Sequence, residues 1–201
     1  MERAALFIDG SNVHATSVST GFFIDYDKLL RYFRERYTIV RPYFYTAISS
    51  TSNVLKLVEH LTHNEYEVRS KPAKEITDSS TGLVKVKGNV DIEMCVDMIK
   101  FAPHLDRIIL FSGDGDFVPV VQFLKDMQKK VTVVSSRKTR PAPMIAEELR
   151  KAADQFIEIT DLPVRHIKPR SASLVVDAVR EETATRKVSL LATRRTVTGR
   201  N

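Results

Sequence analysis

The chain contains 201 residues, of which 31 are Lys or Arg, 25 are Asp or Glu, one is cysteine and 43% are hydrophobic. This length suits one domain with a substantial core, or one domain with a tail, and the apolar fraction excludes a wholly disordered chain. No run approaches ~18 consecutive apolar residues, so we expect no transmembrane helix, and the N-terminus lacks the features of a signal peptide. A lone cysteine cannot form an intramolecular disulfide, so a reducing cytoplasm is the expected compartment.

The net charge of +6 is concentrated at one end of the chain. Residues 1–163 carry 22 basic and 22 acidic side chains, whereas residues 164–201 carry nine basic and three acidic ones. A surplus of positive charge indicates an anionic partner. We therefore divide the chain into a body, residues 1–163, and a basic tail, residues 164–201, which we expect to be mostly disordered.

Apolar runs and helical periodicity alternate along the body. Short apolar or β-branched runs predict strands at residues 4–8, 39–48, 66–69, 107–111, 131–134 and 156–159. Apolar residues at helical spacing predict helices at residues 25–37, 54–61, 118–124 and 142–153, and one from about residue 91 that buries Ile92, Cys95, Val96 and Ile99. Polar residues predict loops at 9–12 and at 71–87, the latter an exposed loop or an irregular hairpin. This alternation predicts an α/β fold, with a mostly parallel sheet and helices on both faces.

Aspartates follow the predicted strands where an open α/β sheet binds its ligands, beyond the carboxyl ends. Asp9 follows the first strand, Asp114 and Asp116 follow the strand at 107–111, and Asp91 begins a helix. Each acid alone also fits a turn or a helix cap, so their joint placement carries the prediction. Converging carboxylates repel one another, and Mg²⁺ or Mn²⁺ is the natural countercharge. Asp97 lies about 240° round the helix from Asp91, so it either supports the site or is merely solvated.

Basic side chains flank the same edge of the predicted sheet. Phosphate could not approach an acidic pocket unless cations beside it offset the repulsion. Two groups lie where loops leave the carboxyl ends of the strands, and each could equally be a solvated loop: Lys71, Lys74, Lys85 and Lys87, and Arg137, Lys138 and Arg140. The aromatic residues 43–45 are expected to pack within a strand rather than to stack on bases.

Three motifs, in this order, resemble the NYN domain family, and more narrowly its LabA-like bacterial branch within the PIN-like nucleases. They are FIDGSN at residues 7–12, KGNVD at residues 87–91 with Asp97 beyond it, and SGDGDF at residues 112–117. The resemblance spans residues 3 to about 160 and implies a Rossmann-like PIN fold, an acidic Mg²⁺ or Mn²⁺ pocket and ribonuclease activity. It implies metal-binding roles for Asp9, Asp91, Asp114 and Asp116, with Asn12 and Ser112 positioning water or phosphate. Gly115 departs from the family pattern, in which a small polar residue such as serine is expected.

Our first hypothesis is a metal-dependent endoribonuclease, with one or two metal ions. The alternative is a non-catalytic RNA-binding or regulatory module that keeps the acidic pocket. A phosphatase acting on small molecules is disfavoured because no Asp-x-Asp motif follows the first strand, and the absence of a glycine-rich fingerprint there argues against a nicotinamide enzyme. Exposed apolar residues of edge elements could pair two copies into a homodimer.

Overall fold

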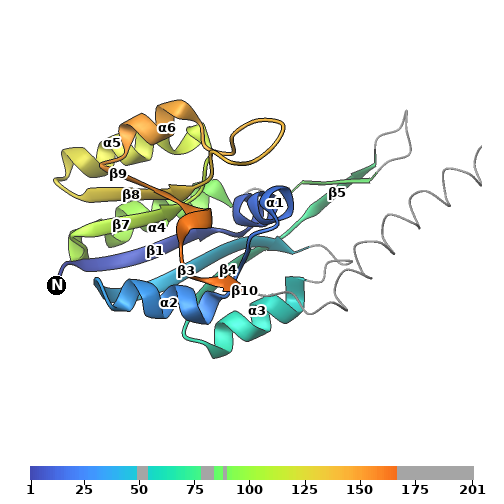
Figure 1. The fold of residues 1–201 in the computed structure, drawn as a ribbon, viewed down its shortest axis with the longest axis horizontal. Coiled ribbons are helices and arrows are strands. Elements are labelled where there is room, and N and C mark those ends of the chain that lie inside the picture. Colours follow the sequence, from blue (N-terminus) through green and yellow to red (C-terminus); the bar gives the residue numbers. More distant parts are fainter. Residues whose placement is uncertain (49–53, 78–83, 88–89, 167–201) are drawn as a thin grey trace, which may run out of the picture. The chain divides into compact units, whose positions relative to one another are not determined.

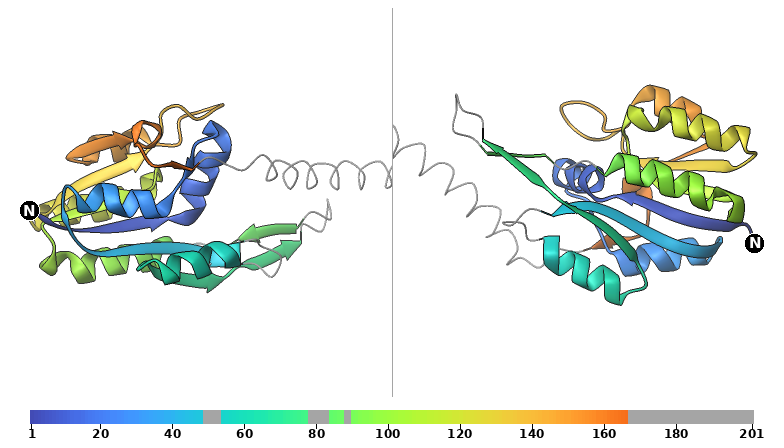
Figure 2. Two further views of the ribbon diagram at one scale, coloured as in Figure 1. Left: turned by 60° about the horizontal axis from the view of Figure 1, so that its bottom comes forward. Right: turned by 180° about the vertical axis from the view of Figure 1, so that it is seen from behind.

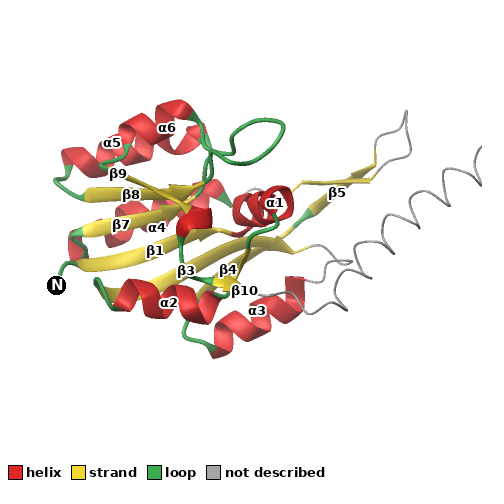
Figure 3. Ribbon diagram, viewed as in Figure 1, coloured by secondary structure: helices red, strands yellow, loops and turns green. Residues whose placement is uncertain are grey.

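Six parallel strands form the central sheet, in the order β4-β3-β1-β7-β8-β9 (Figures 1 and 3). The computed structural model describes residues 1–48, 54–77, 84–87 and 90–166, with residues 74–77, 84–87 and 166 described by their backbone alone. The strands are β1 (Arg3–Asp9), β3 (Thr38–Ile48), β4 (Glu67–Pro72), β7 (Arg107–Phe111), β8 (Lys130–Ser135) and β9 (Gln155–Glu158). Counted in chain order this arrangement is 3-2-1-4-5-6, the order of a doubly wound sheet. The predicted α/β fold is confirmed.

Helices cover both faces of the sheet, as the two views of Figure 2 show. Alternation along β1 sends Ala5 and Phe7 into one core and Leu6 and Ile8 into the other. Residues of α1 (Gly10–Thr20), α2 (Tyr26–Arg34) and α3 (Val54–His63) pack in the core of Leu6, and residues of α4 (Asp91–Phe101), α5 (Val118–Asp126) and α6 (Glu147–Ala152) pack in the core of Phe7. Burial on both faces explains why β1 and β7 are continuous apolar runs. No helix within the described ranges has the length and apolar character needed to cross a membrane.

Two short strand pairs stand beside the sheet. The strands β5 (Lys74–Thr77) and β6 (Val84–Lys87) form an antiparallel pair, so the hairpin expected within residues 71–87 is present. A second pair joins β2 (Phe23–Ile24) to β10 (Arg165–His166). The 3₁₀ turns are η1 (Ala102–His104), η2 (Gly115–Phe117) and η3 (Ile159–Asp161).

The body of the protein extends past residue 163, where we expected it to end. Val164 is fully buried and its carbonyl oxygen accepts the N–H of Asp25 at 2.8 Å, and the next two residues form β10. The compact unit therefore runs from Met1 to His166. The rest of the predicted basic tail, residues 167–201, lies outside the described residues.

The segment after β1 is a helix, α1, and not the polar loop that we expected at residues 9–12. Its composition hid it, because it is rich in serine, threonine and valine, which are poor helix formers, and buries few side chains. The Asp9 side chain starts the helix by accepting backbone N–H groups of its first turn. In contrast, the helix predicted at residues 142–153 is confined to α6, residues 147–152.

The helix α4 buries a different face from the one we predicted. Val90, Met94, Met98 and Ala102 are buried, whereas Ile92, Val96 and Ile99 are 74%, 56% and 41% exposed and Cys95 is half-buried. This helix has two apolar faces. The face made by every fourth residue from Val90 to Ala102 packs against the sheet. The displaced stripe is left at the surface.

Candidate active site

Asp9 is the last residue of β1, and its side chain caps α1. The residue is only 4% exposed. Its Oδ1 accepts the backbone N–H groups of Ser11 and Asn12, both at 3.1 Å, and the Ser11 hydroxyl at 2.7 Å. A carboxylate in this position is stabilised by the positive end of the helix dipole. Asp9 is therefore held in one orientation.

Ser112 links Asp9 to the loop that follows β7. Parallel pairing places Ile8 opposite Phe111, so the residues that follow them are neighbours. The Ser112 hydroxyl donates to Asp9 Oδ2 at 3.1 Å and accepts the Asp114 N–H at 3.3 Å. The strand order reverses here, between β1 and β7, which are the first and fourth strands of this sheet in chain order. Doubly wound sheets bind their ligands at such a point.

Asn12 and the backbone of Gly113 make the second link between α1 and the loop after β7. Asn12 Oδ1 accepts the Gly113 N–H at 3.1 Å. A Cβ at Gly113 would collide with the Met144 carbonyl and would lie 2.7 Å from the Ser135 hydroxyl oxygen. Glycine therefore allows the close approach of three chain segments here. The structure thus brings together four predicted site residues: Asp9, Asn12, Ser112 and Asp114.

Asp116 lies further out than Asp114. Asp114 Oδ1 accepts the Asp116 N–H at 3.0 Å and so begins the 3₁₀ turn η2, while the Asp116 side chain is exposed. At Gly115, where the family resemblance led us to expect a serine, an added Cβ would lie 2.8 Å from Glu148 Oε1. Glu148 is an acid of this loop region that our sequence reasoning missed, since nothing but the acidic first turn of α6 marks it.

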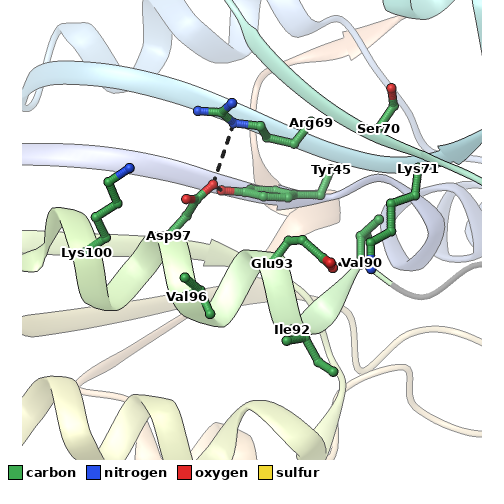
Figure 4. Close-up of a pocket in the computed structure, with 10 residues that line it drawn as sticks. All are labelled: Tyr45, Arg69, Ser70, Lys71, Val90, Ile92, Glu93, Val96, Asp97 and Lys100. Carbon is green, nitrogen blue, oxygen red and sulfur yellow. Dashed lines mark hydrogen bonds and ion pairs between the residues drawn. The ribbon is translucent and has the colours of Figure 1, made fainter.

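Asp97 belongs to a separate groove between β4 and α4, shown in Figure 4. It accepts the Tyr45 hydroxyl at 2.8 Å and lies 3.6 Å from Arg69 Nε. Burial, and then the hydrogen bond to Asp97, raises the pKa of Tyr45 well above its ordinary value. Residues 43–45 are buried, as we expected. Asp97 therefore ties α4 to β3 and β4 and has no hydrogen bond to the Asp9 network within the described residues.

Asp91 stands at the first turn of α4. Its charge reaches Cys95, whose pKa is raised to about 11 by burial first and by Asp91 second. A thiol with such a pKa stays protonated at neutral pH, so Cys95 is a poor nucleophile. This agrees with the apolar packing role expected from its place on the helix.

The predicted basic residues differ in how free their charges are. Lys71 forms an ion pair with Glu93, and Lys138 Nζ lies 2.5 Å from Asp161 Oδ1, which raises the pKa of Lys138. Arg137 and Arg140 are exposed in the loop after β8. The other three lysines lie in the hairpin, where Lys74 pairs with Lys87 and the partner of Ile76 is Lys85. In Figure 1 this hairpin projects from the edge of the sheet at which β1 ends.

The pattern of residues and the fold agree with known proteins. A model of the NYN domain matches residues 3–160. The chain belongs to the NYN domain family. The low amplitude and bright protein LabA of Synechococcus elongatus is 37% identical to it over 163 residues, which are 80% of this chain and 85% of LabA. The resemblance to the LabA-like branch is therefore confirmed.

Two further proteins are similar to this chain. An uncharacterised protein of Methanocaldococcus jannaschii is 29% identical over 159 residues, which are 78% of this chain and 55% of that protein. A solved structure, a protein of unknown function from Vibrio parahaemolyticus, has a TM-score of 0.66 and 28% identity, covering 80% of this chain and 94% of its own. The α/β PIN-like architecture thus has an experimental counterpart.

The carboxylate oxygens of Asp9, Asp91, Asp114 and Asp116 are of the kind that a hard cation binds, and the metal-binding role of these four acids stays a prediction. Across residues 1–48, 54–77, 84–87 and 90–166, no group of three or more His, Cys, Asp and Glu side chains could hold a metal ion together. Mg²⁺, however, commonly takes one or two carboxylates and completes its shell with water and phosphate oxygens. The Ser112 hydroxyl bonds both Asp9 Oδ2 and the backbone N–H of Asp114, which makes these two aspartates neighbours and the candidates for that smaller role.

Proposed function

We propose that this NYN domain is a divalent-metal-dependent ribonuclease that hydrolyses RNA phosphodiester bonds in the crevice between β1 and β7. The observation that carries this proposal is the hydrogen-bonded chain from Asp9 through Ser112 to Asp114 at the point where the strand order reverses. NYN membership supports a nucleic-acid substrate. The LabA relative supports the family assignment without naming a reaction.

In the proposed site Asp9 and Asp114 would hold Mg²⁺ or Mn²⁺, with Asp91 and Asp116 nearer its margin. The ion, when bound, supplies a water of lowered pKa and neutralises charge on the phosphoryl oxygens. Ser112 fixes Asp9 Oδ2 by donating its only hydroxyl proton to it. The Asn12 carbonyl oxygen accepts the Gly113 N–H, and the Asn12 amide N–H groups would donate to a phosphate oxygen.

Basic residues of two loops would hold the flanking phosphates of RNA. Arg137 and Arg140 have the exposed guanidinium groups that pair with phosphate oxygens, and the hairpin supplies Lys74, Lys85 and Lys87. Lys71 and Lys138 would contribute less, because each already pairs with a carboxylate.

The test is the substitution Asp114→Asn, which keeps the shape of the side chain and removes its charge. We expect RNA cleavage in Mg²⁺ or Mn²⁺ to fall at least about a hundredfold, because transition-state charge loses its stabilisation. Asp126→Asn, at the exposed end of α5, is the matched control and should cleave as the wild type does. Equal cleavage by Asp114→Asn and wild type would refute the proposal.

A second candidate is a non-catalytic RNA-binding module. It is supported by the membership in the NYN domain family, which is related to nucleic acids without fixing a reaction. A gel-shift assay with and without Mn²⁺, run beside the cleavage assay, separates the two functions. Binding without turnover in wild-type protein supports the module, and turnover that EDTA abolishes supports the nuclease.

A further inference from the structure

A stripe of large aliphatic side chains runs along the outer face of α4. Ile92, Val96 and Ile99 are 74%, 56% and 41% exposed, and they recur at i, i+4 and i+7 on one side of the helix. The opposite side already packs Met94 and Met98 in the core. A helix that is apolar on a second face needs a second partner, because isolated aliphatic groups at this spacing form the seam of helix pairs.

The stripe borders a groove of about 380 Å³ between α4 and β4 (Figure 4). Val90, Ile92 and Val96 form its apolar wall. Its charged side chains come largely in pairs of opposite sign, namely Lys71 with Glu93 and Arg69 with Asp97. A groove of this kind can receive the side-chain ridge of a neighbouring helix.

The same groove is poorly suited to single-stranded RNA. Bases bind to exposed aromatic rings along a positively charged track. The aromatic ring in this groove, Tyr45, is buried and its hydroxyl is committed to Asp97. The paired charges leave little net positive potential for phosphates.

We propose that α4 is the centre of a homodimer interface, in which two copies pair their α4 helices antiparallel about a two-fold axis near Cys95 and Val96. This axis brings Ile92 against the partner's Ile99, a contact that occurs twice, and Val96 close to the partner's Val96, a contact that occurs once, as in an isologous interface. Antiparallel pairing also aligns the two helix dipoles favourably.

The charges of α4 match this arrangement. Its first turn contains Asp91 and Glu93, of which Glu93 also pairs with Lys71, and its last turn contains Lys100. Reversal of one helix against the other therefore sets the acidic end of each beside Lys100 of the partner subunit. A specific dimer buries roughly 800 Å² on each partner. Phe123 of α5, which packs on the same side of the sheet as α4, is 47% exposed and is a further apolar side chain available on that side.

The mass of the full chain in solution tests the proposal. We expect the wild type to sediment at twice the 22.8 kDa of one chain, and Val96→Glu to sediment as a monomer. Near the two-fold axis this substitution sets two carboxylates against each other, so we expect at least a tenfold weaker association. Leu55→Glu is the matched control, since Leu55 is 57% exposed on α3, against the opposite face of the sheet, and should remain dimeric.

Cross-linking gives a second measurement that does not depend on a destabilising charge. In a Cys95→Ala background, Val96→Cys should be joined to its copy by a short bis-maleimide, whereas Leu55→Cys should not. A monomeric wild type, or a Val96→Glu variant that stays dimeric, would overturn the proposal. The proposal would also be overturned if Val96→Glu lost affinity for RNA while its sedimentation mass stayed that of the wild type. The stripe would then be a nucleic-acid-binding surface.

Discussion

At the scale of single residues, the main feature is that Asp9 serves both structure and the proposed chemistry. One oxygen accepts three hydrogen bonds at the start of α1, and the other reaches Ser112 across the sheet. The sequence predicted Asp9 and Asp114 as site residues because they directly follow two strong strands, whereas Asn12 and Ser112 were expected only from the resemblance to the NYN domain family. It could not reveal that Asp97 faces another groove, because the rotation of α4 is set by packing against the sheet.

Two neighbouring glycines give a prediction at this scale. Gly113→Ala should destabilise the fold by about 1–3 kcal/mol, because the new methyl group meets the Met144 carbonyl, which belongs to the backbone and cannot swing aside. Gly115→Ala meets only the mobile end of Glu148 and should cost about 0.5 kcal/mol or less. Urea unfolding of both variants measures the difference. Similar midpoints for the two would contradict this account.

At the scale of elements, strands were predicted well and helices less well. The strands β1 and β7 are buried on both faces, so their sequences are continuous apolar runs, which are typical of a buried parallel strand. The helix α1 was missed because its residues favour other structures and a side-chain cap starts it. The buried face of α4 was predicted wrongly because two faces of the helix are apolar. Judged by hydrophobicity alone, the face with β-branched residues was favoured over the face with Met94 and Met98, which is the buried one.

The amino ends of three strands are joined by Glu2, which gives a pH-dependent prediction. Its carboxylate accepts Arg107 Nε of β7 at 2.7 Å and Lys130 Nζ of β8 at 2.6 Å, and these hydrogen bonds lower the pKa of Glu2 from 4.5 to about 2. The folded state thus favours the charged form. The stability that this gives is present above pH 4.5 and is lost as the pH falls from 4.5 toward 2.

The Glu2→Gln variant should lack this part of the acid sensitivity. Because the Glu2 side chain is 33% exposed, we expect a difference of about 1 kcal/mol or less. Urea unfolding of wild type and variant across this pH range measures it, and other carboxylates cancel in the comparison. A constant gap between the two proteins at every pH would show that the Glu2 charge contributes nothing.

At the scale of the whole molecule, the positive charge is separate from the balanced body. Residues 167–201 contain eight basic and three acidic residues. Removal of these residues should weaken RNA binding and flatten its salt dependence, because fewer counterions are released from the RNA. Filter binding over a series of salt concentrations measures both. Unchanged affinity and slope would show that the segment does not contact RNA.

The choice of truncation point supplies a control for that experiment. A chain that ends at residue 163 also loses Val164, which is buried, and β10, which pairs with β2. We expect this shorter chain to unfold at lower urea concentration, whereas the chain that ends at His166 keeps the stability of the compact unit.

The order of synthesis gives the link between β1 and β7 a further consequence. The hydrogen bond from Ser112 to Asp9 joins residues 103 positions apart, so the crevice depends on one of the most non-local pairings in the fold. Contacts of this kind are slow to form, because a long loop must close before they repay its entropy. A growing chain on the ribosome carries Asp9 long before Ser112 exists. It cannot assemble the proposed site until β7 has emerged and docked, so the activity that we propose would begin only after that step.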